Sequence, residues 1–310
     1  MKKVQYSRYG GPKELRLDEV AIPEPGQGQV RIRVKAASYN PMDGKIRRGE
    51  MKALSGVRFP RGLGHDFAGE VDAVGPSAQR LKAGDEVFGV TSIPKAGAFA
   101  EFVVADEKNL GLKPPSITFE QAAAITIVSV TAWNGLVARA KLKAGQSVFV
   151  NGCLGGVGRS AVQIGRMRGA HDVGSCSASG REDALRLGVS EVVDYRAFDA
   201  ASYKGRFDVV FDTAGALSLR QCGTMLKAGG VSLHIVPTFA KMVGCLLPSR
   251  HHLVFGNPTP QCLAGVADAA ERGSLAAEIG RVVPLSDAIP AIVELERTDS
   301  PKGKLVIVPA

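Results

Sequence analysis

Apolar and polar residues alternate along the first third of the chain. In residues 30–36 (VRIRVKA) apolar side chains alternate with basic ones, which is typical of a strand with one solvated face. If this alternation continues, Ser38 and Asn40 lie on the same side as Ile32. A further β pattern in residues 67–75 runs toward the turn-like residues 84–89. The first third is therefore predicted to be rich in strands and turns.

The pattern changes after Pro114-Pro115, where an Ala-rich helix is expected and is followed by alternating strand and helix signals. Residues 147–151 form a short β-type run, and apolar residues recur at helical spacing between residues 157 and 168. The later strand candidates are residues 173–176, 207–212 and 231–236. Strands that alternate with helices indicate a parallel sheet with helices on both faces.

The last part of the chain returns to mixed structure. Thr259 is a good helix N-cap and Pro260 suits the first turn, while residues 304–308 form a final strand. We expect this strand to rejoin the N-terminal region. The prediction is an α/β chain with a doubly wound parallel-sheet domain of residues 125–265 and a discontinuous β-rich domain of residues 1–124 and 266–310.

The glycine-rich segment 151–158 (NGCLGGVG) lies between a predicted strand and a predicted helix. Gly155 and Gly156 allow the backbone to approach a pyrophosphate, and Gly158 allows the helix to pack closely on the strand. The helix start, which includes Val157, offers free N–H groups to the anion. Many glycine clusters are only turns, but the strand–turn–helix context favours a dinucleotide site. Because Cys153 stands at the first position of a strict G-x-G-x-x-G, the turn is of the G-x-x-G-x-x-G type.

The second strand of the expected nucleotide domain ends without a carboxylate. NAD sites usually have an acidic residue there to bind the ribose hydroxyls. Here Ser177, Ser179 and Arg181 follow the strand and can donate hydrogen bonds to a 2′-phosphate. The alternative is that Arg181 only solvates a helix start. The chemistry favours NADPH as the cofactor.

Composition narrows the class of protein. The net charge of +9 comes from basic residues scattered along the chain, and no nucleic-acid-binding motif accompanies it, so no nucleic-acid partner is expected. We find no apolar run long enough for a bilayer and no secretory signal, so a cytoplasmic location and no membrane partner are expected. The five cysteines include no C-x-x-C pair and are not expected to form a disulfide framework.

Several segments together resemble one family. They are, in chain order, residues 38–49 (SYNPMDGKIRRG), 64–71 (GHDFAGEV), 83–89 (AGDEVFG), 131–133 (TAW), 155–158 (GGVG), 193–196 (VDYR) and 303–306 (GKLV). The set resembles the quinone oxidoreductase branch of the medium-chain dehydrogenase/reductase superfamily, which also contains alkenal and enone reductases. The resemblance implies a GroES-like catalytic domain with a Rossmann domain, and an NADPH-dependent reductase of quinones or α,β-unsaturated carbonyl compounds. It also implies a homodimer.

The same resemblance argues against zinc. Related alcohol dehydrogenases hold catalytic zinc with a cysteine where this chain has Asn40, and an amide is a poor zinc ligand. No cysteine precedes Cys153, so the four-cysteine structural zinc lobe is missing, and His65 alone does not make a site. We expect no metal. Without a Lewis acid, reduction of a quinone or an activated double bond is favoured over alcohol oxidation.

Asn40 is the first candidate for the catalytic site, because the family's asparagine lines the nicotinamide site; the alternative is a simple Asn-Pro turn. Asp43 is expected to brace the loop, and Tyr39 to pack rather than to donate a proton. The other cofactor contacts that the resemblance and the strand ends imply are Thr131, Tyr195, Ala214, Val236, Phe255, Asn257 and Lys304. Lys304 could equally be a solvated surface lysine, and Thr131 could bond its own helix.

Two further interpretations stay open. The substrate is a quinone or, alternatively, an enone or 2-alkenal, since both need only NADPH and a site. A different class is a non-catalytic NADPH-binding protein, like the crystallin members of the family. Residues 239–252 match no motif, and we expect them to form a dimer contact or a lid.

Overall fold

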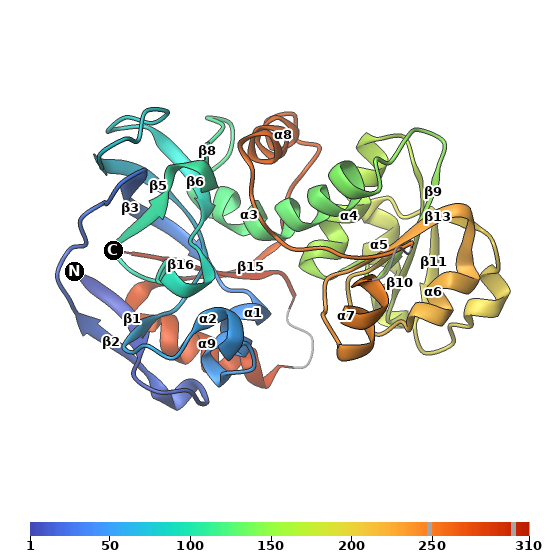
Figure 1. Cartoon of the computed structure of the whole chain (residues 1–310), viewed down its shortest axis with the longest axis horizontal. Coiled ribbons are helices and arrows are strands. Elements are labelled where there is room, and N and C mark those ends of the chain that lie inside the picture. Colours follow the sequence, from blue (N-terminus) through green and yellow to red (C-terminus); the bar gives the residue numbers. More distant parts are fainter. Residues whose placement is uncertain (247–249, 299–301, 310) are drawn as a thin grey trace. The chain divides into compact units, whose positions relative to one another are not determined.

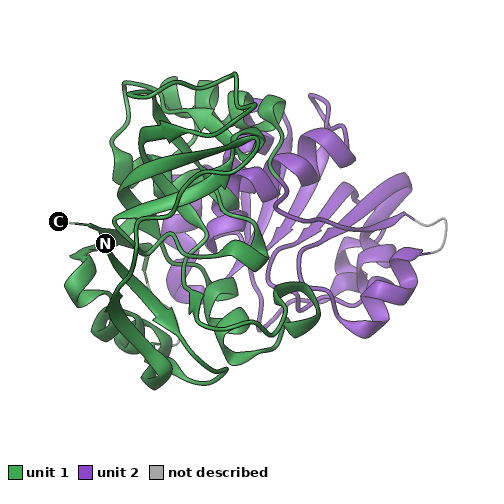
Figure 2. Ribbon diagram, turned by 60° about the vertical axis from the view of Figure 1, so that its left-hand side comes forward, with its two compact units in different colours: residues 1–127, 258–310 green, residues 128–257 purple. Residues whose placement is uncertain are grey.

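The structure is a computed structural model that describes residues 1–246, 250–298 and 302–309. The chain forms two compact units, unit 1 (Met1–Ile127 with Pro258–Ala310) and unit 2 (Val128–Asn257) (Figure 2). The boundaries expected from the sequence, after residues 124 and 265, lie three and eight residues away. The second difference has a packing reason. Helix α8 (Pro260–Glu271) lies in unit 1, where Leu263 lies close to Gly111 of β8 (Leu110–Leu112).

Most strand pairs of unit 1 are antiparallel, whereas β15 (Ile279–Pro284) and β16 (Lys304–Val308) pair in parallel. Its other strands are β1 (Lys2–Tyr6), β2 (Leu15–Glu19), β3 (Gln29–Ser38), β4 (Arg61–Gly62), β5 (Asp66–Val74), β6 (Glu86–Val90), β7 (Phe102–Asp106) and β8. Its helices include α1 (Pro41–Arg48), α2 (Lys52–Ser55), α8 and α9 (Ala288–Arg297). In the described residues the strands form the three-stranded sheet β2-β1-β4 and a seven-stranded sheet in the order β15-β16-β3-β5-β6-β8, with β7 also paired to β3.

Strand β3 is the centre of the larger sheet. Val30, Ile32 and Val34 are buried, whereas Arg33 between them is exposed, which confirms the predicted strand with one solvated face. Strand β16 pairs antiparallel with β3 and sets Val306 opposite Ser38. The prediction that the last strand rejoins the N-terminal region is confirmed. This pairing brings residues 38–40 and 304 together from opposite ends of the sequence. Figure 1 shows both strands, β3 and β16, in the same unit.

Unit 2 is a parallel sheet in the order β11-β10-β9-β12-β13-β14. Its strands are β9 (Ser147–Asn151), β10 (His171–Cys176), β11 (Glu191–Asp194), β12 (Phe207–Asp212), β13 (Leu226–His234) and β14 (His251–Leu253), and its helices include α4 (Gly156–Met167), α5 (Arg181–Leu187), α6 (Leu219–Met225) and α7 (Phe239–Leu246). The strand order reverses between β9 and β12. In open α/β sheets, ligands bind at the carboxyl ends of the strands beside such a reversal.

Two predicted elements differ in detail from the structure. Strand β13 begins at Leu226, five residues before the predicted start, because its register shifts opposite Phe207 and Val209 and so hides the alternation. The Ala-rich helix is α3 (Phe119–Trp133), which continues as a π-helix over Asn134–Arg139. By length and composition alone, these 21 residues could cross a membrane, which differs from the expectation that the chain has no such run. Of its most apolar window 67% is buried in the protein, as in the core helix of a globular domain.

Candidate functional site

The glycine-rich turn of unit 2 joins β9 to α4. Gly152 has a φ of +81°, which favours glycine. A Cβ on Gly158 would lie 2.1 Å from the Gly152 carbonyl oxygen, so this glycine permits the close approach of helix to turn. A Cβ on Gly156 would lie 2.8 Å from Val128 Cγ1, whereas the nearest atom to a Cβ on Gly155 would be 3.4 Å away. Of the glycines at positions 155, 156 and 158, Gly155 is thus the one at which a Cβ would make only an ordinary contact.

The start of α4 has no side-chain cap. Gly155 is its N-cap residue and leaves the first helical amides, those of Gly156, Val157 and Gly158, without a side-chain acceptor. Gly155 and Gly156 are exposed, and Val157 is half-buried. Exposed amides at the positive end of a helix dipole form an anion site. The structure therefore presents the geometry that a pyrophosphate needs.

A buried hydrogen-bond network lies beside the glycine-rich turn and stabilises it. The Ser175 hydroxyl donates to Asn151 Oδ1 over 2.6 Å, and Gly152 N donates to Ser175 Oγ over 3.1 Å. Asn151 Nδ2 in turn donates to Asp212 Oδ1 over 2.7 Å. The ends of β9, β10 and β12 are thereby tied together, which fixes the backbone of the turn.

Lys241 of α7 completes the network. Its Nζ lies 2.6 Å from Asp212 Oδ2 and donates to the Gly215 carbonyl over 3.0 Å, and both charged side chains are buried. His234 Nδ1 lies 3.7 Å from the same Asp212 oxygen. Burial acts to raise the pKa of Asp212, but the nearby His234 and the hydrogen bonds from Lys241 and Asn151 outweigh it and lower this pKa. The Asp212 carboxylate is therefore fully paired and ionised.

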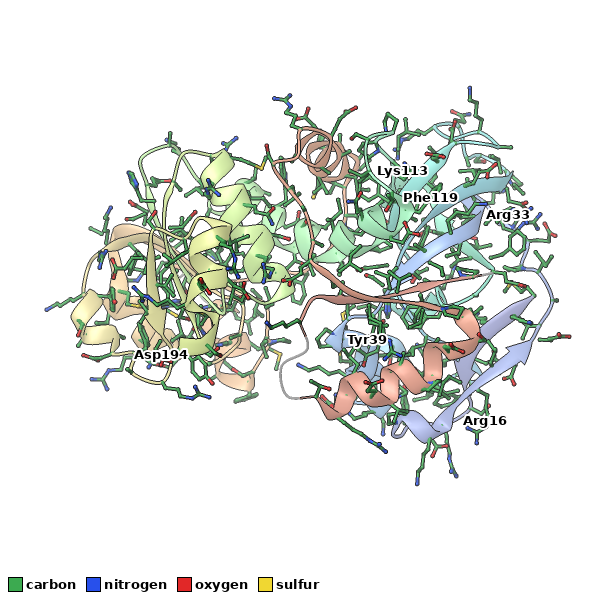
Figure 3. The ribbon with its side chains drawn as sticks, turned by 180° about the vertical axis from the view of Figure 1, so that it is seen from behind. Arg16, Arg33, Tyr39, Lys113, Phe119 and Asp194 are labelled. Atoms are coloured by element: carbon green, nitrogen blue, oxygen red, sulfur yellow. The ribbon has the colours of Figure 1, made fainter. Side chains whose placement is uncertain are left out.

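Polar residues gather at the tip of β10. The Ser177 and Ser179 hydroxyls lie 3.1 Å apart, and Tyr195 N donates to the Cys176 carbonyl over 3.0 Å. Arg181 is exposed but donates one N–H to the Val192 carbonyl over 2.9 Å, which leaves the rest of its guanidinium facing outward. The Arg196 guanidinium lies 5.0 Å from the centre of the exposed Tyr195 ring. Figure 3 labels Asp194, which ends β11 just before this pair.

The remaining predicted cofactor contacts of unit 2 lie after strand ends or in α3. Thr131 is buried in α3, so a direct cofactor contact stays a prediction. Ala214 is exposed two residues after β12, and Val236, half-buried two residues after β13, packs on Gly215. Phe255 and Asn257 are exposed, and their carbonyls accept from Asn134 Nδ2 over 3.0 and 2.8 Å.

In unit 1, Asn40 is the N-cap residue of α1 and lies two positions after the end of β3. The Asp43 carboxylate accepts from the Asn40 backbone N–H over 2.8 Å, which is the bracing role expected of Asp43. The other Asp43 oxygen lies 2.6 Å from His65 Nδ1, and both side chains are buried. His65 Nε2 has no hydrogen-bond partner among the described residues. Asp43 and His65 thus fix the helix start on which Asn40 sits.

The Asn40 side chain is held by two ionisable groups. Its Nδ2 donates to Asp66 Oδ2 over 2.9 Å and to the Ser38 carbonyl over 3.4 Å, and its Oδ1 accepts from Lys304 Nζ over 2.5 Å. Lys304 Nζ lies 3.7 Å from Asp66 Oδ2, beyond hydrogen-bond length. Two of the residues predicted for the site, Asn40 and Lys304, therefore touch within unit 1, and Lys304 is not a solvated surface lysine.

The charges in this cluster are incompletely paired. Burial raises the pKa of Asp66, against the charge of Lys304 and the bond from Asn40, and Asp66 Oδ1 has no partner among the described residues. Burial also lowers the pKa of Lys304, against the charges of Asp66 and Asp43. Strongly perturbed titratable groups in contact with one another are typical of functional sites.

Tyr39 has a packing role, as expected. Its hydroxyl donates to Glu296 of α9, which also pairs with the buried Arg47 over 2.7 Å (Figure 3). Its ring lies 6.4 Å from that of Phe99. Burial and the bond to Glu296 raise the pKa of Tyr39 far above the usual tyrosine range. A phenol held in this way is a poor proton donor.

Four polar residues of these clusters were not singled out from the sequence. They are Asp66, Asn151, Asp212 and Lys241. Asp66 lies in the G-H-D run and Asn151 opens the glycine-rich segment, so their positions carried a signal. Lys241 had none, because it lies in a stretch without a motif; residues 247–249 of that stretch lie outside the described residues.

Two segments of the chain match known protein families. Residues 26–115 match the family described as "Alcohol dehydrogenase GroES-like domain", and residues 187–307 match "Zinc-binding dehydrogenase". Human quinone oxidoreductase is 31% identical over an alignment 331 positions long, which covers 99% of this chain and 98% of the relative. An NADPH-dependent alkenal/one oxidoreductase of Arabidopsis thaliana is 37% identical over 239 residues, which cover 74% of this chain and 61% of the relative. The quinone oxidoreductase structure from Coxiella burnetii has a TM-score of 0.88 at 28% identity, with 99% of each chain covered.

The GroES-like unit and the Rossmann-type sheet define an oxidoreductase of the medium-chain dehydrogenase/reductase superfamily, a class that uses a nicotinamide cofactor. Within this superfamily, the chain belongs to the quinone oxidoreductase family.

The description "zinc-binding" raises the question of whether the residues present fit a metal. Zinc prefers thiolate, imidazole and carboxylate ligands in a tetrahedron. Here Asn40 offers an amide oxygen, and that oxygen is bound by the Lys304 ammonium 2.5 Å away. A dication beside Asp66 and His65 would meet this positive charge. In the described part of the chain no group of three or more His, Cys, Asp or Glu residues could hold a metal ion. The residues do not fit zinc.

Proposed function

We propose that this oxidoreductase is an NADPH-dependent reductase that delivers hydride to a quinone or an α,β-unsaturated carbonyl compound without zinc. The observation that carries the proposal is the uncapped, exposed start of α4 after the glycine-rich turn. The nicotinamide of the bound cofactor supplies the hydride. The chain positions both partners and supplies hydrogen-bond donors where negative charge develops.

The choice of NADPH over NADH rests on the tip of β10. Ser177, Ser179 and Arg181 present hydroxyl and guanidinium donors where a ribose-binding carboxylate would stand. Arg196, beside Tyr195, adds a second exposed guanidinium. Arginine binds phosphate oxygens with charge-assisted hydrogen bonds. These donors support a 2′-phosphate as the ligand.

The substrate class has two candidates within the same chemistry. The human relative is named a quinone oxidoreductase, and the Arabidopsis relative acts on alkenals and enones by its name. In both reactions, hydride adds to an electrophilic carbon and negative charge appears on a conjugated oxygen. A non-catalytic NADPH-binding protein is the alternative from another class.

The test is a fluorescence titration with NADPH and with NADH, followed by cofactor oxidation against a panel of quinones, enones and 2-alkenals. The proposal expects tighter binding of NADPH and turnover of at least one acceptor class. Binding without turnover of any acceptor would support the binding-only alternative. Equal affinity for NADH would show that Ser177 and Arg181 do not bind the 2′-phosphate of NADPH.

We also propose that two chains associate as a homodimer. In the described residues β14 is the edge strand of the sheet in unit 2, and α7 packs beside it. Phe239, Met242 and Leu246 are exposed and lie on one side of α7. Clusters of exposed apolar side chains are uncommon on monomeric proteins and often mark an interface. Light scattering should give twice the chain mass, and Leu246→Glu should shift the species toward the monomer. A monomeric wild-type chain would refute this proposal.

A further inference from the structure

Lys304 is the residue of the Asn40–Asp66–Lys304 cluster that still has hydrogen-bond donors to offer. An ammonium carries three N–H groups, and among the described residues only Asn40 Oδ1 accepts one within hydrogen-bond length. The Asn40 amide has no such reserve. Its two N–H groups face Asp66 Oδ2 and the Ser38 carbonyl, and its oxygen is taken by Lys304.

The position of Lys304 is set by the fold. Strand β16 pairs with β3 so that residue 304 approaches the start of α1, and the lysine is the first residue of its strand. Only about an eighth of its side chain is exposed, with a relative area of 12%. The cluster therefore holds one cation in a place with little water, where its interaction with an anion is strong.

We infer that Lys304 is the catalytic group that donates a hydrogen bond, and then a proton, to the substrate oxygen on which negative charge develops. This inference rests on the proposed function. It assigns to a lysine ammonium of the chain the charge stabilisation that a metal ion gives in zinc enzymes. Asn40 and Asp66 are positioning residues, because they act on the substrate through Lys304.

The reaction transfers one hydride and one proton to the substrate. Hydride from the reduced nicotinamide forms a C–H bond at the electrophilic carbon, and the π electrons of the conjugated system move onto the oxygen. A Lys304 N–H bond breaks as that oxygen takes the proton, which gives an enol. With a quinone, the carbon that received the hydride then loses a proton to water as the second carbonyl oxygen gains one, and the ring becomes the hydroquinone. The neutral Lys304 amine then regains a proton from water. The substrate gains two electrons and two protons overall, and the nicotinamide is oxidised.

The charges around Lys304 poise it for this transfer. Its charged neighbours are Asp66 of β5 and Asp43 of α1, and both carboxylates favour the ammonium form. His65, which precedes β5, contacts Asp43. Burial acts in the other direction and wins, so the pKa of Lys304 lies below the usual lysine range. A lowered pKa makes the ammonium a better acid than a solvated lysine. We expect the rate to fall as the pH rises through this pKa.

The experiment compares Lys304→Met, Lys304→Arg and Lys304→Ala with the control Lys302→Met, which removes the same charge from an exposed residue two positions earlier. For each variant, NADPH affinity is measured by fluorescence titration, and hydride transfer by single-turnover oxidation of NADPH with the best quinone or enone. Lys304→Met should slow hydride transfer about 100-fold with NADPH affinity changed by less than about threefold. Lys304→Arg should recover only part of the rate, because its guanidinium keeps the charge but does not give up its proton. Lys302→Met should match the wild-type rate.

Two readouts separate catalysis from a structural role. The decline of the wild-type rate at high pH should be absent from Lys304→Arg, and ethylammonium should restore part of the Lys304→Ala rate. The inference is overturned if Lys304→Met transfers hydride within about threefold of wild type, or if its whole loss comes from weaker NADPH binding. It is equally overturned if thermal unfolding shows that Lys304→Met and Lys304→Arg both lose the fold and ethylammonium restores nothing to Lys304→Ala. A wild-type chain that reduces no acceptor would refute the proposed function instead.

Discussion

Each unit of the chain contains a buried cluster of an asparagine, an aspartate and a lysine, and the two clusters differ in where the lysine is bound. In unit 2 the ammonium of Lys241 lies 2.6 Å from one oxygen of Asp212, and Asn151 donates to the other oxygen over 2.7 Å. Every charge in that cluster has a close partner. Such a cluster fixes the strand ends below the glycine-rich turn.

In unit 1 the lysine is bound to the amide instead. Lys304 lies 2.5 Å from Asn40 Oδ1 but 3.7 Å from Asp66, whose second oxygen has no partner among the described residues. The pKa of Asp66 is raised and that of Asp212 is lowered, although both carboxyls are buried. The same three residue types thus build a structural anchor in one unit and an incompletely paired, chemically available group in the other.

Asp172 extends the comparison to a carboxyl that has no hydrogen-bond partner in the part of the chain that the structure describes. Both of its oxygens are buried without a hydrogen bond in the described residues, and burial raises its pKa to about 7, with Arg166 acting against this. Because the pKa is higher in the folded state than the unfolded 3.8, its contribution to stability is full below the unfolded pKa and is lost as the pH rises toward 7. Across this pH window, the free energy of unfolding of wild type should fall relative to that of Asp172→Asn by as much as about 4 kcal/mol. Urea unfolding of both proteins at several pH values measures this difference. Parallel curves would contradict the assignment.

The two lysines should differ sharply in their contribution to stability. Lys241→Met leaves the buried Asp212 without its cation, and removal of one partner of a buried pair should lower the free energy of unfolding by about 3 kcal/mol. Lys304→Met leaves Asn40 Oδ1 without its donor but takes no hydrogen-bonded cation from a carboxylate, and should lower the free energy of unfolding by only about 1 kcal/mol. Urea unfolding of the matched pair of variants checks this. Equal losses would mean that the two clusters have the same role.

Replacement of the glycines of the turn should separate its structural positions from its binding position. A Cβ on Gly155 would make an ordinary contact, with its nearest atom 3.4 Å away, so Gly155→Ala should have the melting temperature of wild type. If a pyrophosphate lies against this glycine, the same variant should bind NADPH about tenfold more weakly, a change of about 1.4 kcal/mol. Gly158→Ala should instead lower the melting temperature, since its Cβ would lie 2.1 Å from a backbone oxygen. Unchanged NADPH affinity in Gly155→Ala would place the phosphates elsewhere.

The smallest effect is expected at the tip of β10. Arg181→Gln removes a charge from the proposed 2′-phosphate site and should reduce the preference for NADPH over NADH about fivefold, or about 1 kcal/mol. Arg186→Gln is the control, because that arginine of α5 pairs with Glu182 and Asp183 on an exposed surface. Fluorescence titrations with both cofactors measure the ratio. An unchanged ratio in Arg181→Gln would leave the arginine only its bond to Val192.

The elements that local patterns determine could be predicted from the sequence. The alternation around Ile32 marks β3 because one face is buried, and Thr259 begins α8 because its hydroxyl accepts from Cys262 N. The glycine-rich turn could be predicted for the same reason, since the close packing at Gly158 depends on backbone geometry within a few residues.

Contacts between distant residues could not be predicted in this way. The bond from Lys304 to Asn40 joins residues 264 positions apart and depends on the register of β16 against β3. The pair of Lys241 and Asp212 depends on how α7 packs beside the sheet, and no pattern near Lys241 encodes that packing. Sequence motifs therefore gave Asn40 and Lys304 as separate candidates, and only the fold shows that they form one cluster.

The opposite electrostatic states of the two clusters can be measured directly. Titration of chain labelled with ¹³C at the aspartate carboxyl carbon, with Asp66→Asn and Asp212→Asn to assign the two signals, gives both carboxyl pKa values by NMR. The account predicts that Asp66 titrates above the usual aspartate range and Asp212 below it. If both carboxyls titrate below that range, the cluster in unit 1 is a paired structural anchor like its counterpart, and Lys304 has no poised charge to offer.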